Sequence, residues 1–353
     1  MRILVAGGAG MIGSHLCERL ISTGHEVICV DNLITGRRAN LKALLSHPGF
    51  HFVQHDVVLE LPTFPRLHRV YHLASPASPI GYTRSPIETL RVNSEGTRRL
   101  LELAALHRAR LLYTSTSEIY GDPLEHPQTE AYRGNVSCTG PRSMYDEAKR
   151  YGEALTMAYV RARHVDARIV RIFNTYGPRA DADDGRLVGN LITQALTGRA
   201  MTIYGDGTQT RSLCYVSDTV EGLIQAMESA RARGEVINLG NPDERTVLEC
   251  ARIVRDLIGS TSEFVFMPPA VGDDPKVRCP DIRKGQALLG WGPTVGIREG
   301  LTHTIAHFRE VLGMGAVRDP QPSTNGTLAS HSRRDRTPLR APARAGDAPT
   351  RSS

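Results

Sequence analysis

The stretch Arg2-Ile-Leu-Val-Ala6-Gly7-Gly-Ala-Gly10-Met-Ile-Gly13 decides the fold of this 353-residue chain. Its apolar beginning predicts a buried strand, and the residues that follow Gly10 have the spacing of a helix. Glycines between the two let the backbone approach a pyrophosphate, which the free N–H groups of the helix would face. A plain glycine-rich turn is the alternative, but the flanking strand and helix favour a dinucleotide site. The residues assigned to this turn are Gly7, Gly10, Met11, Ile12 and Gly13.

Strand-like and helix-like segments alternate through the first half of the chain, which predicts an α/β fold with a Rossmann-type, doubly wound parallel sheet. The expected strands are 2–6, 26–30, 51–54, 69–73, 110–114 and 168–173, and the expected helices are 11–23, 86–107 and 142–164. Beyond residue 174 the loops lengthen, and the short strands 201–204 and 236–239 alternate with the helices 186–197, 217–230, 246–257 and 297–311. We therefore predict a dinucleotide-binding domain (1–174), a smaller, mainly substrate-binding lobe (175–313) and a disordered tail (314–353) rich in Arg, Pro and Ser.

Charge and cysteine content narrow the class of protein. The net charge is +6, but seven arginines and three aspartates lie in residues 316–353, so the rest is nearly neutral and we expect no nucleic-acid partner. Six scattered cysteines form no Cys-x-x-Cys pair, which predicts free thiols and no metal site; Cys279 stands beside candidate site residues. Without an apolar run of membrane length or a secretory signal, we expect a cytoplasmic protein with no membrane partner.

The end of the second predicted strand suggests which dinucleotide binds. Asp31 follows that strand, where a carboxylate accepts hydrogen bonds from a ribose 2′-hydroxyl and repels a 2′-phosphate. NAD is therefore favoured over NADP, although Arg37 and Arg38 follow closely and weaken the argument. Asp56 and Val57, at the end of the third strand, are expected at the adenine, with a solvated strand end as the alternative. The remaining cofactor-binding candidates are Asn32, Leu73, Tyr145, Lys149 and Thr175.

Tyr145 and Lys149 supply a second constellation, because residues four apart share one face of a helix. A free phenol titrates near pH 10, at about the pKa of an ordinary tyrosine, and is a poor base at neutral pH. A nearby ammonium group and a positively charged nicotinamide would lower that pKa. Tyr145 would then accept a proton from a sugar hydroxyl. Thr116-Ser117-Glu118, at the end of the fifth strand, adds hydroxyl groups and a carboxylate.

Longer stretches resemble one family. They are His72-Leu-Ala-Ser-Pro-Ala-Ser-Pro79, Ser115-Thr-Ser-Glu-Ile-Tyr-Gly-Asp-Pro-Leu-Glu-His-Pro127, Gly140-Pro-Arg-Ser-Met-Tyr145-Asp-Glu-Ala-Lys149, Arg171-Ile-Phe-Asn-Thr-Tyr-Gly-Pro-Arg179, Tyr204-Gly-Asp-Gly-Thr-Gln-Thr-Arg211 and Asp273-Asp-Pro-Lys-Val-Arg-Cys-Pro-Asp281. The chain resembles an extended short-chain dehydrogenase/reductase over residues 1 to about 312, and is most similar to the UDP-glucuronic acid decarboxylases, also called UDP-xylose synthases. Ser75, Arg133 and Met144 depart from the residues common in that family and leave the choice between uridine and thymidine open.

The resemblance implies a redox-neutral, NAD-dependent decarboxylation of UDP-glucuronic acid to UDP-xylose through a 4-keto intermediate. Tyr145 would deprotonate the sugar 4-hydroxyl with Lys149 beside it. By the same resemblance, Glu118 and Ser117 act around C4 and C5, Thr116 binds sugar hydroxyls, and Arg278 lies near the carboxylate. The implied nucleotide-sugar contacts are Pro79, Tyr82, Asn174, Arg186, Asn190, Tyr204, Gln209, Arg211 and Arg278. For Pro79 and Tyr82, a proline-rich loop packed on the sheet is the alternative.

Three other functions use the same kind of nucleotide-binding fold as the decarboxylases. A 4,6-dehydratase is disfavoured, because Ser117 stands where those enzymes carry an additional acid. A nucleotide-sugar 4-epimerase is the main alternative, although Glu118 stands where epimerases generally carry a small hydroxyl residue. A non-catalytic NAD-binding protein would have no need of Tyr145, Lys149 and Glu118. Relatives in the family are usually homodimers, and the helices 86–107 and 142–164 are the segments expected at that interface.

Overall fold

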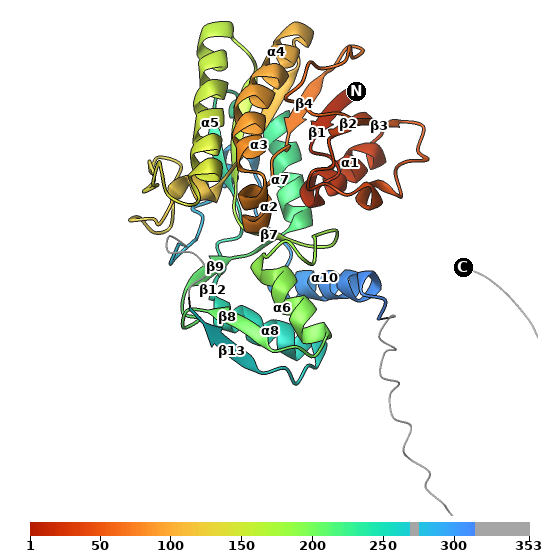
Figure 1. The fold of residues 1–353 in the computed structure, drawn as a ribbon. Coiled ribbons are helices and arrows are strands. Elements are labelled where there is room, and N and C mark those ends of the chain that lie inside the picture. The colour runs from red at the N-terminus through yellow and green to blue at the C-terminus, as the bar shows by residue number, and fades with distance from the viewer. Residues whose placement is uncertain (269–274, 315–353) are drawn as a thin grey trace, which may run out of the picture. The chain divides into compact units, whose positions relative to one another are not determined.

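The structure is a computed structural model that describes residues 1–268 and 275–314. Its centre is a seven-stranded parallel sheet with the order β11-β6-β5-β4-β1-β2-β3 (Figure 1). The strands are β1 (Arg2–Ala6), β2 (Glu26–Asp31), β3 (Phe50–Gln54), β4 (Arg69–His72), β5 (Arg110–Thr116), β6 (Ala167–Ile172) and β11 (Val236–Leu239). The order reverses at β1, beside β4, which confirms the predicted doubly wound sheet.

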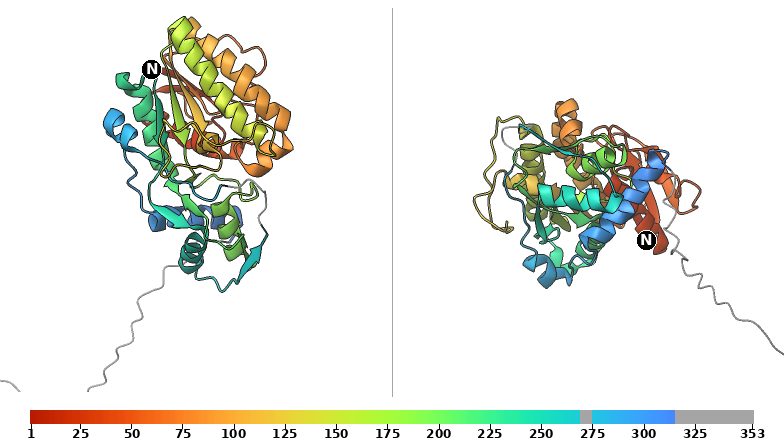
Figure 2. Two further views of the ribbon diagram at one scale, coloured as in Figure 1. Left: turned by 90° about the vertical axis from the view of Figure 1, so that its left-hand side faces the viewer. Right: turned by 90° about the horizontal axis from the view of Figure 1, so that it is seen from below.

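Helices cover both faces of this sheet, because its strands are apolar on both sides. One core joins the sheet to α1 (Met11–Ser22), α7 (Val216–Glu228) and α9 (Arg283–Leu289). The opposite core joins it to α4 (Thr97–His107) and α5 (Ser143–Arg163), which lie side by side in Figures 1 and 2. Further short elements are α2 (Pro79–Arg84), α3 (Pro86–Arg91), η1 (Arg38–Leu41), η2 (Val92–Gly96), η3 (Ser117–Tyr120) and η4 (Ala230–Ala232).

The predicted helix 86–107 is interrupted by a π-helical turn, η2. Asn93, in this turn, is buried and donates to the Ser75 hydroxyl (2.9 Å), while its side-chain oxygen accepts from Tyr113 (3.2 Å). The widened turn thus directs a polar side chain into the interior next to the sheet. Such turns are often found at functional sites.

One strand that was expected in the smaller lobe belongs to the main sheet. Residues 236–239 were expected in the smaller lobe, but β11 pairs in parallel with β6, from Val236 opposite Ile169 to Leu239 opposite Ile172. The physical reason is burial: Ile237 and Leu239 are fully buried in the core under α1 and α7. Four residues of alternating pattern do not indicate which sheet they join.

The remaining residues form a smaller core of their own. It contains α6 (Leu187–Leu196), α8 (Val247–Ile258) and α10 (Ile297–Val311), packed on the parallel pair β8 (Met201–Tyr204) and β13 (Phe264–Met267). Two short ladders lie nearby, β7 (Thr175–Tyr176) with β10 (Cys214–Tyr215), and β9 (Thr210–Ser212) with β12 (Glu244–Thr246). Of the predicted tail, 314–353, all but Met314 lies outside the described residues. None of the described helices is long and apolar enough to cross a membrane.

Candidate active site

The glycine turn between β1 and α1 forms a close-packed cradle. Gly7 has φ +81°, and a side chain there would meet the backbone of Ala74 at 2.6 Å. A Cβ at Gly13 would lie 2.2 Å from the Gly7 carbonyl oxygen, so only glycine lets α1 begin this close to β1. Gly10 is the N-cap of α1 and offers no side-chain cap, which leaves the N–H groups of the first turn for an anion. Met11 and Ile12 form the start of that turn.

A pocket continues from this cradle along the ends of the strands. Gly7, Gly10, Asp31, Asn32, Asp56, Val57 and Leu73 line it, and so do the unpredicted residues Thr35, Gly36, His55 and Ser75. Asp31 is buried and accepts from the N–H groups of Ala9 (2.9 Å) and Leu33 (2.8 Å). Burial raises its pKa, and the two backbone donors oppose that rise. The glycine cradle and this carboxylate are a donor and acceptor set that fits the phosphates and a ribose of NAD.

Arg37 and Arg38, which could have bound the 2′-phosphate of NADP, contact other side chains instead. Arg37 forms an ion pair with Asp181, and the guanidinium of Arg38 lies 5.3 Å from the centre of the Phe52 ring. Asn32 donates to Asp56 (3.1 Å), so these two side chains meet at the pocket. Thr175 lies in β7, where its hydroxyl donates to the Phe173 carbonyl and shares a hydrogen bond with Thr219.

The predicted catalytic residues come from the end of β5 and the start of α5. Thr116 ends β5 and caps η3, because its hydroxyl accepts from the Glu118 N–H (3.2 Å). This cap turns the chain so that Ser117 and Glu118 follow the sheet at its carboxyl edge, where open α/β sheets bind their ligands. Tyr145 is buried in the first turn of α5 and hydrogen-bonds with Thr116.

Burial shifts the pKa values of both Tyr145 and Lys149. It raises the pKa of Tyr145, and the hydrogen bond from Thr116 offsets only part of the rise; the expected lowering by a bound nicotinamide stays a prediction. Burial lowers the pKa of Lys149 to about 7, with Glu153 acting against it. The Lys149 ammonium donates to the Thr114 carbonyl (2.9 Å) and lies 5.1 Å from the centre of the Tyr113 ring. At Tyr145, burial therefore favours the neutral phenol over the phenolate.

Glu118 is the charged centre of the site. Its carboxylate accepts from Arg278 (3.3 Å) and forms a shorter ion pair with Arg142. Burial raises the pKa of Glu118, but Arg278, Arg142 and Arg211 outweigh it, so the pKa is lowered. Arg278 is almost fully buried and also donates to the Ser117 carbonyl. Two predicted residues, Glu118 and Arg278, therefore meet at this carboxylate, and Arg278 joins them to a third through the Ser117 carbonyl.

Arg142 is a site residue that the sequence analysis did not identify. It lies three residues before Tyr145 and is 9% exposed, with its guanidinium 3.8 Å from Asp146 as well as beside Glu118. The signal was present in the sequence, because residues three apart share a helix face and Arg142 stands inside the Gly140–Lys149 motif. A single arginine before a helix is usually a surface residue, so the sequence alone does not identify Arg142 as part of the site.

The predicted substrate-binding residues are spread over more elements. Tyr82, in α2 after Pro79, is buried, and its ring stacks on that of Tyr145 at 5.0 Å between centroids. Arg211 donates to the Pro275 carbonyl (2.9 Å), and its charge acts on both Glu118 and Arg278. The charge of Arg186, at the N-cap of α6, acts on Tyr145.

The other substrate-binding candidates lie farther along the smaller core. Asn190 is in α6, one turn after Arg186. Asn174 lies between β6 and β7 and accepts from the Cys214 N–H (2.9 Å). Tyr204 is exposed at the end of β8, and the Gln209 side chain donates to its carbonyl. Asn190, Tyr204 and Gln209 thus belong to the smaller lobe, whereas Asn174 follows β6 of the main sheet.

The comparisons with known proteins agree with this geometry. A family model described as "NAD dependent epimerase/dehydratase family" matches residues 3–240. UDP-glucuronic acid decarboxylase 1 of Danio rerio is 50% identical over 311 residues, which are 88% of this chain and 73% of that protein. UDP-glucuronic acid decarboxylase 6 of Arabidopsis thaliana is 51% identical over 315 residues, or 89% of this chain and 90% of that protein.

Solved structures show the same fold. The UDP-glucose 4-epimerase of Thermotoga maritima, solved with UDP-glucose, is 31% identical with a TM-score of 0.79, over 88% of this chain and 100% of that one. The UDP-glucuronic acid 4-epimerase of Bacillus cereus, in complex with UDP-glucuronic acid and NAD, is 29% identical with a TM-score of 0.79 over the same shares.

Proposed function

We propose, because this chain belongs to the NAD-dependent epimerase/dehydratase family and within it to the UDP-glucuronic acid decarboxylases, that it converts UDP-glucuronic acid to UDP-xylose and CO₂. The reaction depends on NAD and is redox-neutral over a full cycle. One observation carries the proposal beyond similarity: a partly buried carboxylate, Glu118, is held by Arg278 and Arg142 in the site that also contains Tyr145. Those arginines are suited to an anionic sugar.

NAD, when bound, would supply the hydride acceptor for C4 of the sugar and, as NADH, the hydride donor that restores it. The glycine cradle at Gly7, Gly10 and Gly13 holds its phosphates at the start of α1, and Asp31 binds a ribose hydroxyl. Asp31 is buried where the ribose would bind, and its negative charge would repel a 2′-phosphate. It therefore disfavours a cofactor that carries that phosphate.

Tyr145 accepts the proton of the sugar 4-hydroxyl. Its pKa is raised in the protein alone, so it needs positive charge to become a base. The bound cofactor would supply that charge, and Lys149, one turn farther along α5, would add to it. Thr116 hydrogen-bonds with Tyr145 and so fixes the phenol oxygen at the end of β5. The stacked ring of Tyr82 covers the other side of this phenol and excludes water.

The 4-keto sugar loses CO₂ because its ketone is β to the C6 carboxylate, so the electron pair of the broken C5–C6 bond enters an enolate. Arg278 and Arg142 bind the anionic substrate, which competes with Glu118 for their guanidinium groups. Glu118 and Ser117 act around C4 and C5, and a proton is delivered to C5 before C4 is reduced. Arg211 and Arg186 bind the diphosphate, since a planar guanidinium can donate two hydrogen bonds to it.

The experiment that tests this function is an incubation of the purified protein with UDP-glucuronic acid and NAD, followed by proton NMR of the sugar and by CO₂ release. We expect UDP-xylose and CO₂ in equal amounts, without net NADH. Tyr145→Phe should lower turnover by at least about 100-fold while NAD still binds. UDP-galacturonic acid without CO₂ would instead make the protein a 4-epimerase, and no product would direct the test to thymidine nucleotides.

Two further properties belong to the same proposal. The protein acts as a homodimer through α3, α4 and α5, whose outer surfaces expose the large apolar side chains Ile87, Leu90, Leu106 and Tyr151. It acts in the cytoplasm, where its cysteines, all six of them free in the structure, remain reduced.

A further inference from the structure

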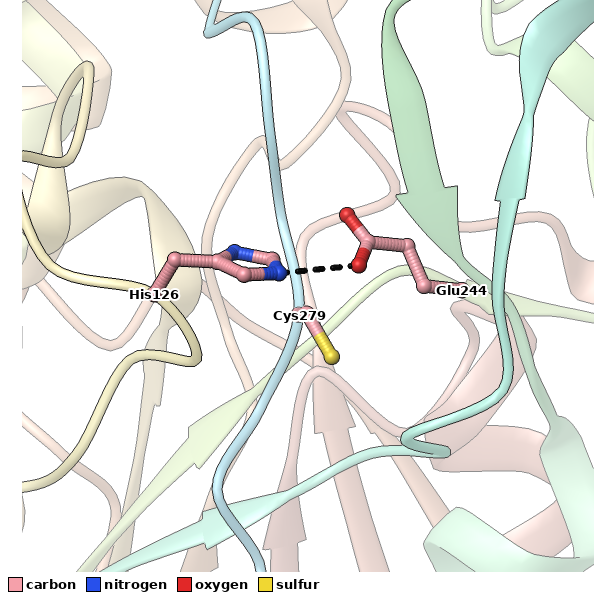
Figure 3. A group of neighbouring side chains, drawn as sticks. All are labelled: His126, Glu244 and Cys279. Atoms are coloured by element: carbon pink, nitrogen blue, oxygen red, sulfur yellow. Dashed lines mark ion pairs between the residues drawn. The ribbon is translucent and has the colours of Figure 1, made fainter.

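His126, Glu244 and Cys279 bring three different ligand types together beside the active site. Their ligand atoms all lie within 4.8 Å of one another, and the His126 imidazole is 2.9 Å from the Glu244 carboxylate. Figure 3 shows the imidazole and the carboxylate pointing toward each other, with the thiol of Cys279 beside them. The three residues come from separate segments, namely the loop after η3, strand β12 and the segment before α9.

The backbone around each ligand is well held. Cys279 donates its N–H to the Gln128 side chain (2.9 Å), and its carbonyl accepts from the Gln128 N–H (2.9 Å). This exchange ties the cysteine to the loop that carries His126. Glu244 pairs with Ser212 across the β9–β12 ladder, and its carboxylate also accepts from the Thr210 hydroxyl. The ligands are therefore positioned before any ion arrives.

We propose that His126, Glu244 and Cys279 form a binding site for a zinc-class divalent cation, which inhibits the enzyme through Arg278. Zinc prefers imidazole nitrogen, thiolate sulfur and carboxylate oxygen, at about 2.0–2.3 Å, and a set of three protein ligands leaves its fourth position to water. The half-exposed imidazole gives an ion access from solvent, while the thiol beneath it is 6% exposed. Sulfur among the ligands selects zinc over magnesium or calcium.

Binding releases protons. The cation binds the thiolate, so the thiol proton of Cys279 leaves to solvent, and so does any proton on the His126 imidazole, because a metal binds only the neutral ring. The contact between His126 and Glu244 is replaced at the same time by two metal–ligand bonds.

Inhibition follows from the position of Cys279 in the chain, and this part rests on the proposed function. Arg278, the residue before it, donates to the Ser117 carbonyl and to Glu118. During turnover Arg278 must exchange Glu118 for the substrate carboxylate. A cation that joins Cys279 to His126 and Glu244 adds three bonds to a segment whose backbone Gln128 holds at this point, and the added restraint on the neighbouring Arg278 slows that exchange.

The test uses Co²⁺ as a spectroscopic probe of the full-length protein with reduced thiols, followed by competition with Zn²⁺. Wild type should develop a thiolate-to-cobalt absorption band at one ion per chain, and Zn²⁺ should abolish it. Cys279→Ser should lose the band and bind Zn²⁺ at least about 100-fold more weakly, because the thiolate is the strongest ligand of the three. His126→Gln should weaken binding, and Glu244→Gln tests the carboxylate separately.

Cys138→Ser is the matched control, because Cys138 is an exposed thiol outside the cluster. It should bind the cation as wild type does, and circular dichroism should show that every variant is folded. A band that survives in Cys279→Ser, or none in wild type, would overturn the site. If inhibition is correct, Zn²⁺ lowers decarboxylation by the wild type but not by Cys279→Ser. Binding of Zn²⁺ without this difference in activity would overturn the inhibition and leave the site itself standing. An inactive wild type that still binds the cation would contradict the proposed function and leave the site standing.

Discussion

Arg142 lies between two carboxylates, those of Glu118 and Asp146, at the first turn of the helix that carries Tyr145. Desolvation alone would raise the pKa of this partly buried glutamate, and the charges of Arg278, Arg142 and Arg211 reverse that shift. The second guanidinium keeps Glu118 ionised in the protein without substrate. It also gives the site a positive group that becomes available when the substrate carboxylate displaces Glu118.

Substitution of Arg142 should therefore impair decarboxylation while NAD still binds. Arg142→Lys keeps the charge but loses the planar fork, and we expect kcat to fall by at least about 10-fold, with a larger loss in Arg142→Ala. CO₂ release measures kcat, and calorimetry measures NAD affinity. Arg161→Lys, at an exposed position of the same helix, is the matched control and should be fully active. Normal turnover in Arg142→Ala would leave this ion pair with a purely structural role.

At the scale of the element, glycines in the turn between β1 and α1 have two different roles. Gly13 lets α1 pack close to β1, and Gly10 leaves space for the cofactor. A methyl group at Gly13 would lie 2.2 Å from the Gly7 oxygen and 2.8 Å from Gly8 Cα, both of them backbone atoms, so α1 would have to move. At Gly10 the nearest atom would be 3.4 Å away and the backbone is extended, so the fold itself accepts a side chain there.

Gly13→Ala should therefore destabilise the protein without cofactor by about 1–3 kcal/mol and abolish NAD binding. Gly10→Ala should keep the stability of the cofactor-free protein but weaken NAD by at least about 10-fold, because its methyl group lies where the pyrophosphate approaches the helix. Thermal unfolding with and without NAD measures both effects. Gly292→Ala, with no atom within 4 Å of the added carbon, is the control. Equal effects of the two substitutions would refute this separation.

The elements that sequence predicted well are those whose signal is local. The strand–glycine–helix unit and the Tyr145–Lys149 spacing depend on neighbours in the chain, and the structure has these elements at the expected residues. Residues 236–239 were misplaced because a four-residue strand finds its partner, β6, only in the folded sheet. The π-turn η2 was missed because one extra residue in a helix hardly changes the hydrophobic pattern.

The same difference between local signals and contacts formed on folding explains which parts of the candidate site were predicted. Glu118 and Tyr145 stand in recognisable motifs, whereas the ion pair of Glu118 with Arg142 forms only when β5 and α5 are brought together. The rise in the pKa of Tyr145 comes from burial, which a spacing of residues does not reveal. His126, Glu244 and Cys279 are far apart in the chain and match no metal-binding spacing, although their side chains meet.

At the scale of the whole molecule, the proposed dimer makes a prediction about α3, α4 and α5. Wild type should sediment as a dimer at micromolar concentrations. The double substitution Leu90→Glu and Tyr151→Glu should produce monomers, because it places charges on exposed apolar positions of both helical segments. Leu124→Glu is the control, since Leu124 is exposed in the loop after η3. A wild type that sediments as a monomer at all concentrations would contradict the proposed interface.

The pairing of β11 with β6 has a consequence for how the protein is made. Strand β6 ends at Ile172 and its neighbour begins at Val236, so residues of the smaller core are synthesised before the sheet is complete. That smaller core in turn needs Leu301, Ile305 and Phe308 from α10, the last described helix. On the ribosome, neither core can close before the other has begun. A nascent chain that stalls within this interval exposes the open edge of β6, and we expect chaperones to bind it there.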